Sequence, residues 1–145
     1  MLKHIPNCLS PDLLKILMEM GHGDELVIGD GNFAAAGFAN RLVRCDGVGV
    51  LPILDAVLTF FPLDTFVDYP FSVMKVVGDE NAKPEIWNDF ERIAFEREGY
   101  DRGFEQVERF EFYERAKKAY AIVATSEEAH YACLILKKGV KPAEK

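Results

Sequence analysis

The sequence predicts a single α/β domain, in which helices flank a largely parallel sheet. Short apolar runs typical of buried strands alternate with segments whose apolar residues recur at helical spacing. The 145 residues are the usual size of one domain and can bury a core, so residues 1–145 are expected to form one unit. A hydrophobic content of 49% with 28% charged residues is typical of globular proteins.

The first half of the chain predicts two helices and two strands. Ser10 can cap a helix that Pro11 begins and Gly21 ends. The continuous apolar run after it indicates a buried strand, and the small residues that follow indicate a loop. The expected elements are a helix from Ser10 to Gly21, strands over 25–30 and 41–46 separated by a loop over 31–40, and a helix over 51–60.

The second half continues the alternation. One amphipathic segment has apolar residues every three or four positions and a glycine, Gly99, that can end the helix. The expected elements are strands over 71–77 and 104–110, a loop over 78–84, helices over 84–99 and 112–119, and strands over 120–125 and 131–139.

Composition excludes several classes of function. The net charge of −7 argues against nucleic-acid binding, because a phosphate backbone requires a basic surface. The three cysteines, Cys8, Cys45 and Cys133, form no C-x-x-C pair, so we expect neither a disulfide framework nor a metal site, and a cytoplasmic location. No run resembles a signal peptide or a membrane span, and no glycine-rich motif suggests a nucleotide cofactor.

The stretch MGHGDELVIGD, residues 20–30, holds the first group of candidate site residues. A histidine such as His22 can give and take a proton near neutral pH, although a helix cap or a surface residue is the simpler reading. Asp30 closes a strand, where α/β sheets bind ligands, although it can equally cap its own turn. Asp24 either orients His22 or faces water.

A second group lies in ERFEFYERA and the residues after it. Tyr113, Lys117 and Tyr120 share one helical face if that helix continues, and Arg109 precedes it. Tyrosine and arginine can hold a sugar through its faces and hydroxyls. The alternative for Tyr120 is a core position, since it begins an apolar run.

A third group, His130, Tyr131 and Cys133, surrounds the start of the last strand. The simplest reading makes His130 a surface loop residue. Cys133 as a nucleophile would need an electropositive setting, which the sequence does not establish. We therefore interpret Cys133 as a small apolar residue.

Taken in order, these segments resemble the FucU/RbsD family, specifically its L-fucose mutarotase branch. The resemblance extends from about residue 2 to residue 141. The segments that carry it are LSPDLLKILMEMGHGDELVIGDGNF, RCDG, LPILDAVLTFFPLDTFV, ERFEFYERAKKAYAIVATSE and YACLILKKGV.

The resemblance implies an enzyme that interconverts the α and β anomers of a free monosaccharide, L-fucose or a related sugar, without a cofactor or a metal. It further implies a ring-shaped homo-oligomer, commonly a decamer, with sites near subunit boundaries and no membrane partner. By resemblance His22 is the acid/base residue, and the sugar-binding residues are Asp30, Asp64, Arg109, Tyr113 and Tyr131.

Two departures from the family pattern bear on substrate preference. The last family motif is typically Tyr-Gly-Asn, whereas this chain has Tyr131-Ala132-Cys133, so a weakly hydrogen-bonding thiol replaces an amide. The family's usual proline after Phe33 is also missing. Pyranose–furanose interconversion, a non-catalytic sugar-binding module and a purely structural ring remain alternative hypotheses.

Overall fold

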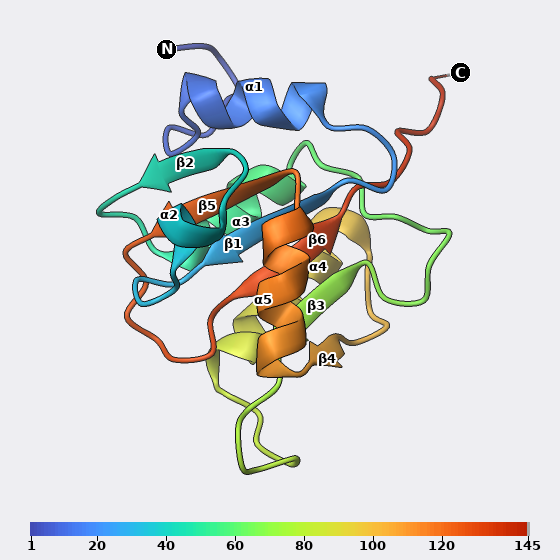
Figure 1. The fold of residues 1–145 in the computed structure, drawn as a ribbon. Helices are drawn as coiled ribbons and strands as arrows, with labels where there is room; N and C mark the ends of the chain where they lie inside the picture. Colours follow the sequence, from blue (N-terminus) through green and yellow to red (C-terminus); the bar gives the residue numbers. More distant parts are fainter. Residues whose placement is uncertain (145) are drawn as a thin grey trace.

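The computed structural model describes residues 1–144, which form helices on both faces of one sheet (Figure 1). The helices are α1 (Pro11–Glu19), α2 (Ala35–Phe38), α3 (Val50–Leu58), α4 (Ile86–Glu98) and α5 (Arg109–Lys118). The strands are β1 (Glu25–Gly29), β2 (Leu42–Cys45), β3 (Phe71–Met74), β4 (Glu105–Val107), β5 (Ala121–Thr125) and β6 (Leu134–Lys137).

The six strands lie in the order β2-β5-β1-β6-β3-β4. The pairs β1–β5, β2–β5 and β3–β4 are parallel, whereas β6 is antiparallel to both of its neighbours, β1 and β3. The predicted largely parallel sheet is therefore confirmed, with β6 as its one reversed strand. The reversal places the start of β6 at the edge of the sheet where the other strands end.

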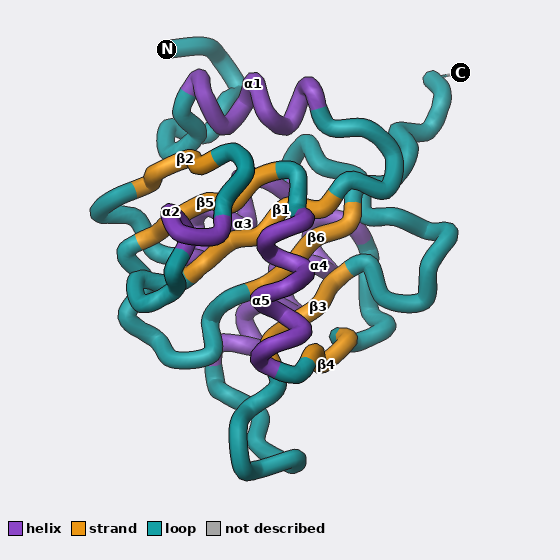
Figure 2. The backbone as a smooth tube through the Cα atoms, viewed as in Figure 1, coloured by secondary structure: helices purple, strands orange, loops and turns teal. Residues whose placement is uncertain are grey.

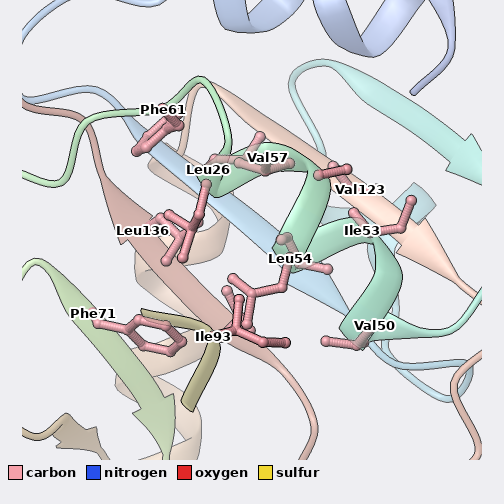
Figure 3. Close-up of a cluster of buried hydrophobic side chains, with 14 of the residues drawn as sticks. Leu26, Val50, Ile53, Leu54, Val57, Phe61, Phe71, Ile93, Val123 and Leu136 are labelled. Carbon is pink, nitrogen blue, oxygen red and sulfur yellow. The ribbon is translucent and has the colours of Figure 1, made fainter. Parts of the chain in front are cut away.

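Two hydrophobic cores lie on opposite faces of the sheet because strand side chains alternate between faces. Leu26 and Ile28 of β1 join the core under α1, α3 and α4, while Val27 joins the core under α2 and α5. Figure 3 shows the larger core, in which Ile53 and Leu54 of α3 meet strand side chains. Burial on both faces explains the continuous apolar runs of the central strands.

The helix ends follow the predicted chemistry in most places. The Ser10 side chain accepts the N–H of Leu13 at 3.1 Å, as an N-cap does. Gly99 ends α4 in the left-handed conformation, with φ of 62°. Helix α1 ends at Glu19, two residues before Gly21, because the chain turns extended at Met20.

Three predictions of local structure need correction. The expected strand over 104–110 is only the three-residue β4, because the Glu108 carboxylate caps the N–H groups of Phe110 and Glu111 and starts α5 at Arg109. Residues 31–40 are not wholly a loop, since the alanines at 34–36 begin the single turn α2. Helix α5 also ends at Lys118, so Tyr120 lies beyond it and is half-buried rather than core.

Both chain ends lie at the same end of the molecule (Figure 2). No helix within residues 1–144 has the length and apolar character needed to cross a membrane.

Helix α5 crosses the sheet and is fixed to it by Arg115. Its guanidinium lies 2.6 Å from Glu25 at the start of β1 and 2.5 Å from Glu105 of β4. The same group donates to the Ser72 hydroxyl of β3 at 3.4 Å. The Arg115 side chain is only 23% exposed, so these ion pairs are less screened by solvent than the surface pairs of this chain.

Replacing Arg115 tests this clamp. Arg115→Met is expected to lower the free energy of unfolding by about 2 kcal/mol, between the values for surface and buried ion pairs, because it leaves two carboxylates facing each other unpaired. Arg92→Met is the matched control, since Arg92 pairs with Asp89 and Glu96 in solvent. Urea unfolding measures both, and equal losses would contradict a special role for Arg115.

Candidate functional site

A polar pocket lies where β1 ends and β6 begins. Its volume is about 320 Å³, within the usual range for small-molecule sites. The residues that line it are Asp30, Asn32, Phe33, Met74, Val77, Arg109, Tyr113, His130, Tyr131 and Cys133. Four of the six sugar-contacting or catalytic residues implied by the resemblance, Asp30, Arg109, Tyr113 and Tyr131, therefore share one pocket.

Asp30 forms the inner wall of this pocket. It follows the last residue of β1, is 9% exposed, and its Oδ1 accepts the N–H of Asn32 at 3.0 Å. Its own N–H donates to the Cys133 sulfur at 3.4 Å. The turn-capping reading is thus correct for one carboxylate oxygen, while the pocket position of Asp30 leaves a carboxylate oxygen for a ligand hydroxyl.

Cys133 is part of the pocket wall, at the position where the resembling family has the asparagine of its Tyr-Gly-Asn motif. Burial raises the pKa of its thiol well above the usual value, and the nearby Asp30 carboxylate acts in the same direction. The thiol therefore stays protonated, so Cys133 is a weak hydrogen-bonding group and not a nucleophile.

Tyr131 is held in an uncommon backbone conformation. Its φ is 55°, in the left-handed region, which costs a residue with a side chain about 1 kcal/mol. The Trp87 indole N–H donates to the Tyr131 carbonyl at 2.9 Å, and the Val77 N–H donates to the Tyr131 hydroxyl at 3.2 Å. These two contacts fix the phenol in the pocket and leave its O–H hydrogen free to donate to a ligand.

Helix α5 supplies the opposite wall. Tyr113 is half-buried against the rings of Phe33 and Phe38, with centroids 6.1 and 5.2 Å away. Arg109, the first residue of α5, is exposed and its guanidinium lies 4.6 Å from the centre of the Phe110 ring. In residues 1–144 no carboxylate forms an ion pair with Arg109 by the 4 Å limit, so its donors remain free for a ligand.

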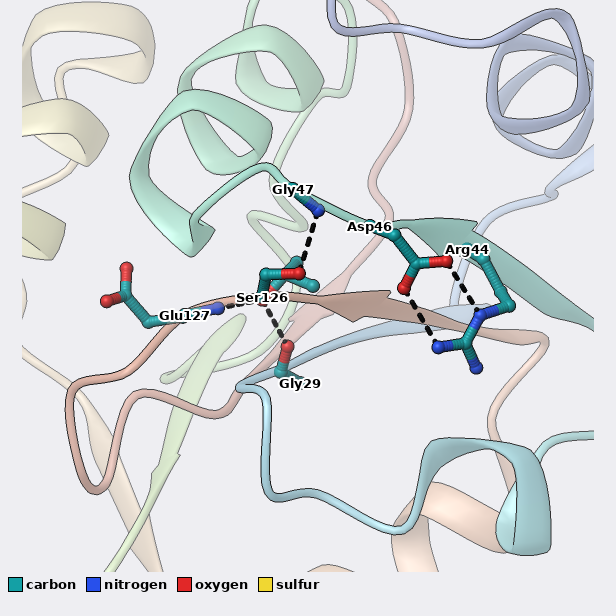
Figure 4. A network of polar contacts seen from close by, with 7 residues as sticks. Gly29, Arg44, Asp46, Gly47, Ser126 and Glu127 are labelled. Atoms are coloured by element: carbon teal, nitrogen blue, oxygen red, sulfur yellow. Dashed lines mark hydrogen bonds and ion pairs between the residues drawn. The ribbon is translucent and has the colours of Figure 1, made fainter.

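A polar network supports the loops next to the pocket (Figure 4). The Thr125 hydroxyl donates to the Gly29 carbonyl at 2.7 Å, and the Ser126 hydroxyl accepts the Gly47 N–H at 2.7 Å. The Glu127 carboxylate accepts the N–H of Val50 at the start of α3. These bonds fix the ends of β1 and β5, and with them Asp30.

His22 lies at the other edge of the sheet, paired with Asp64. His22 Nε2 is 3.0 Å from Asp64 Oδ1, and the ring centroids of His22 and Phe66 are 5.2 Å apart. The His22 side chain is 45% exposed, whereas that of Asp64 is only 4% exposed. If Nε2 carries the hydrogen that Asp64 accepts, Nδ1 presents its lone pair to solvent.

The end of strand β6 holds this pair together. Lys138 accepts the N–H of Gly23 at 2.8 Å, and Gly139 donates to the Pro62 carbonyl at 2.8 Å. A Cβ on Gly139 would come within 2.6 Å of the Leu63 carbonyl oxygen, so only glycine permits this close approach of two backbones. The approach brings Asp64 to the turn that contains His22.

Asp64 is ionised under ordinary conditions. Burial alone would raise its pKa, but the Phe66 N–H and the His22 ring more than offset this, and the pKa lies below the usual value. The sugar-binding role that the resemblance implies for Asp64 stays a prediction; within the chain, its carboxylate contacts the His22 ring and the Phe66 N–H. The Asp24 carboxylate instead accepts the N–H of Gly21 at 2.7 Å.

Within one chain, His22 and the pocket are separated by the length of β1. Five strand residues at about 3.3 Å each place the two ends roughly 13 Å apart. A sugar held by Asp30 therefore does not reach His22 of the same chain.

No three His, Cys, Asp or Glu side chains of residues 1–144 are grouped closely enough to hold a metal ion.

The comparisons with known proteins agree with this architecture. Residues 3–141 match the RbsD / FucU transport protein family. The chain belongs to this family. The fucose mutarotase of Homo sapiens is 47% identical over 96% of this chain and 94% of the relative. The L-fucose mutarotase of Actinobacillus pleuropneumoniae serotype 5b is 42% identical over 99% of this chain and its own full length.

Solved structures of the family have the same fold. The fucose mutarotase of Streptococcus pneumoniae in complex with L-fucose has a TM-score of 0.92 and 50% identity, covering 97% of this chain and 100% of that one. RbsD of Bacillus subtilis, complexed with D-ribose, has a TM-score of 0.71 at 24% identity over 98% of this chain and 100% of that one. The latter similarity shows only a shared fold.

The ionised state of Asp64 predicts how stability depends on pH. Because its pKa is lower in the folded chain, the unfolded chain takes up the proton first, and the contribution of Asp64 is lost as pH falls below about 4. Asp64→Asn is expected to lower the free energy of unfolding by about 1–2 kcal/mol at neutral pH. The difference from the unsubstituted protein shrinks in acid.

Urea unfolding at neutral pH and at about pH 3.5 measures this difference on both sides of the usual carboxyl pKa. Asp68→Asn, on the same segment but exposed, is the control and should change stability little. A loss for Asp64→Asn that is constant with pH would contradict the assigned ionisation.

Proposed function

We propose that this protein is a cofactor-free sugar mutarotase that interconverts the α and β anomers of L-fucose or a closely related monosaccharide. The observation that carries the proposal is one pocket lined by Asp30, Arg109, Tyr113 and Tyr131 in a chain 42–47% identical to fucose mutarotases over nearly its full length. Such a set of an acceptor and several donors suits a polyhydroxylated ligand.

The reaction requires only proton transfers. A base removes the proton of the anomeric hydroxyl while an acid protonates the ring oxygen, and the C1–O5 bond breaks to give the open-chain aldehyde. Rotation about C1–C2 presents the other face of the aldehyde. The reverse transfers then close the ring as the opposite anomer, and every proton returns to its source.

The residues divide this work between binding and proton transfer. The Asp30 carboxylate accepts sugar hydroxyls, while Arg109, Tyr113 and Tyr131 donate, so the sugar is held in one orientation. His22 gives and takes the proton, with Asp64 fixing the ring and its tautomer.

The separation of His22 from the pocket supports a site shared by two copies of the chain. In a heterologous interface, the His22 edge of one copy contacts the pocket edge of the next, and repetition closes a ring. Both edges carry exposed apolar side chains. Beside His22, Phe66 is 76% exposed, and beside the pocket, Phe110 is 60% exposed and Val77 is 58% exposed. We propose the ring to be a decamer.

The proposed location is the cytoplasm. Cys8, Cys45 and Cys133 are all free thiols, which is the usual state of cysteine in a reducing compartment.

Proton NMR exchange spectroscopy on equilibrated sugars tests the activity, because it measures the rate at which the anomers interconvert. Cross-peaks between the α and β anomers of L-fucose are expected to grow faster with the protein than in buffer. His22→Ala should slow the exchange by about 10²–10⁴-fold, the usual contribution of one acid/base group. His4→Ala is the control, because His4 is an exposed histidine near the N-terminus.

Exchange indistinguishable from buffer for every sugar tested would refute the enzyme, and an unchanged rate in His22→Ala would refute the role of His22. Cross-peaks between pyranose and furanose signals, without cross-peaks between the two pyranose anomers, would instead show that the protein catalyses pyranose–furanose interconversion. Multi-angle light scattering on the same samples measures the oligomer.

A further inference from the structure

The pocket contains a histidine of its own, His130, which no step of the proposed reaction uses. It is the residue before Tyr131 and lines the pocket together with Asp30, Arg109 and Tyr113. His22 lies at the other end of β1, so His130 is the histidine that the same chain contributes to the pocket. His130 is exposed, as its interpretation as a surface loop residue predicts.

The backbone around His130 is fixed. Residue 131 adopts the left-handed conformation, and the Trp87 indole holds its carbonyl at 2.9 Å. The Val77 N–H holds the Tyr131 hydroxyl at 3.2 Å. Strain that is maintained by such contacts is typical of functional sites, because the surrounding structure must keep a side chain in one place.

Some polar side chains of the pocket already form hydrogen bonds within the chain, whereas His130 does not. Asp30 accepts the Asn32 N–H, and the Tyr131 hydroxyl accepts the Val77 N–H. The His130 ring, by contrast, takes part in no hydrogen bond or ion pair with another group of residues 1–144 by the usual distance limits. A neutral imidazole has one donor and one acceptor nitrogen, which matches a sugar hydroxyl that both gives and receives a hydrogen bond.

We propose that His130 is a further substrate-binding residue, whose imidazole hydrogen-bonds a hydroxyl of the bound sugar at the mouth of the pocket. The inference rests on the proposed function, because the ligand is the monosaccharide that the pocket would bind. It assigns His130 to binding and specificity, while proton transfer remains with His22. His130 thereby adds a hydrogen-bonding group to a pocket in which the Cys133 thiol is a poor one.

Kinetics of anomer exchange test the proposal first. His130→Leu is expected to raise KM for L-fucose about tenfold and leave kcat within about twofold, since losing a hydrogen bond that is formed equally in ground and transition states changes binding alone. His130→Gln, which keeps a donor and an acceptor, should recover part of the loss. His4→Leu should change neither constant.

Chemical protection gives a readout of direct contact. Diethyl pyrocarbonate modifies exposed imidazoles, and the chain has three histidines, which mass spectrometry of proteolytic peptides distinguishes. Saturating L-fucose is expected to slow modification of His130 at least severalfold while leaving His4 unchanged.

The outcomes separate the two proposals. Anomer exchange with an unchanged KM in His130→Leu, or with no protection of His130, would overturn the role of His130 and leave the mutarotase intact. Absence of exchange and of L-fucose binding in the unsubstituted protein would overturn the proposed function and this inference together.

Discussion

The antiparallel pairing of β6 between β1 and β3 is the constraint on which both parts of the site depend. Strand β6 begins directly after Tyr131 and Cys133, which line the pocket. It ends just before Lys138 and Gly139. The backbone of Lys138 and Gly139 bonds the turn before β1 and the segment that carries Asp64. A parallel strand at this position would bring the Tyr131 loop to the wrong edge of the sheet.

Strand β1 explains why the proposed site is divided between two ends of the sheet. A sheet places ligands at the edge where its parallel strands end, and Asp30, Arg109 and Tyr113 obey that rule through β1, β4 and α5. His22 precedes β1 and so lies at the opposite edge. In the proposed mechanism a second copy of the chain supplies His22 to the pocket, which would make oligomer assembly a condition for activity.

Much of this could be predicted from the sequence, for identifiable reasons. Buried strands leave continuous apolar runs, and Ser10 and Gly99 mark helix ends through their own side-chain and backbone chemistry, so most elements were predicted near their observed bounds. The start of α5 was missed because the cap is a glutamate, Glu108, which is not among the preferred capping residues. The predicted strand over 104–110 is too long for the same reason, because its last residues belong to the cap and first turn of α5.

The candidate site was less accessible to sequence reasoning because it depends on contacts between distant segments. The resemblance to a family supplied the site residues, but not the pairing of His22 with Asp64, which are 42 positions apart. Nor could spacing reveal that His130 and Cys133 line the pocket, since this follows from the left-handed turn at Tyr131. Gly139 is a position with a local signal that the sequence analysis did not use, because a glycine close after an apolar strand often marks a close backbone approach.

The shared site is the central claim, and subunit complementation tests it most directly. His22→Ala removes the histidine that a chain would supply to its neighbour but leaves the chain's own pocket intact, whereas Arg109→Ala damages only the pocket. In oligomers assembled from both variants, some sites therefore combine an intact pocket from one chain with His22 from the other. Random mixing should restore about a quarter of the native exchange rate, although each variant alone is nearly inactive. Mixed oligomers no more active than the separate variants would contradict the account.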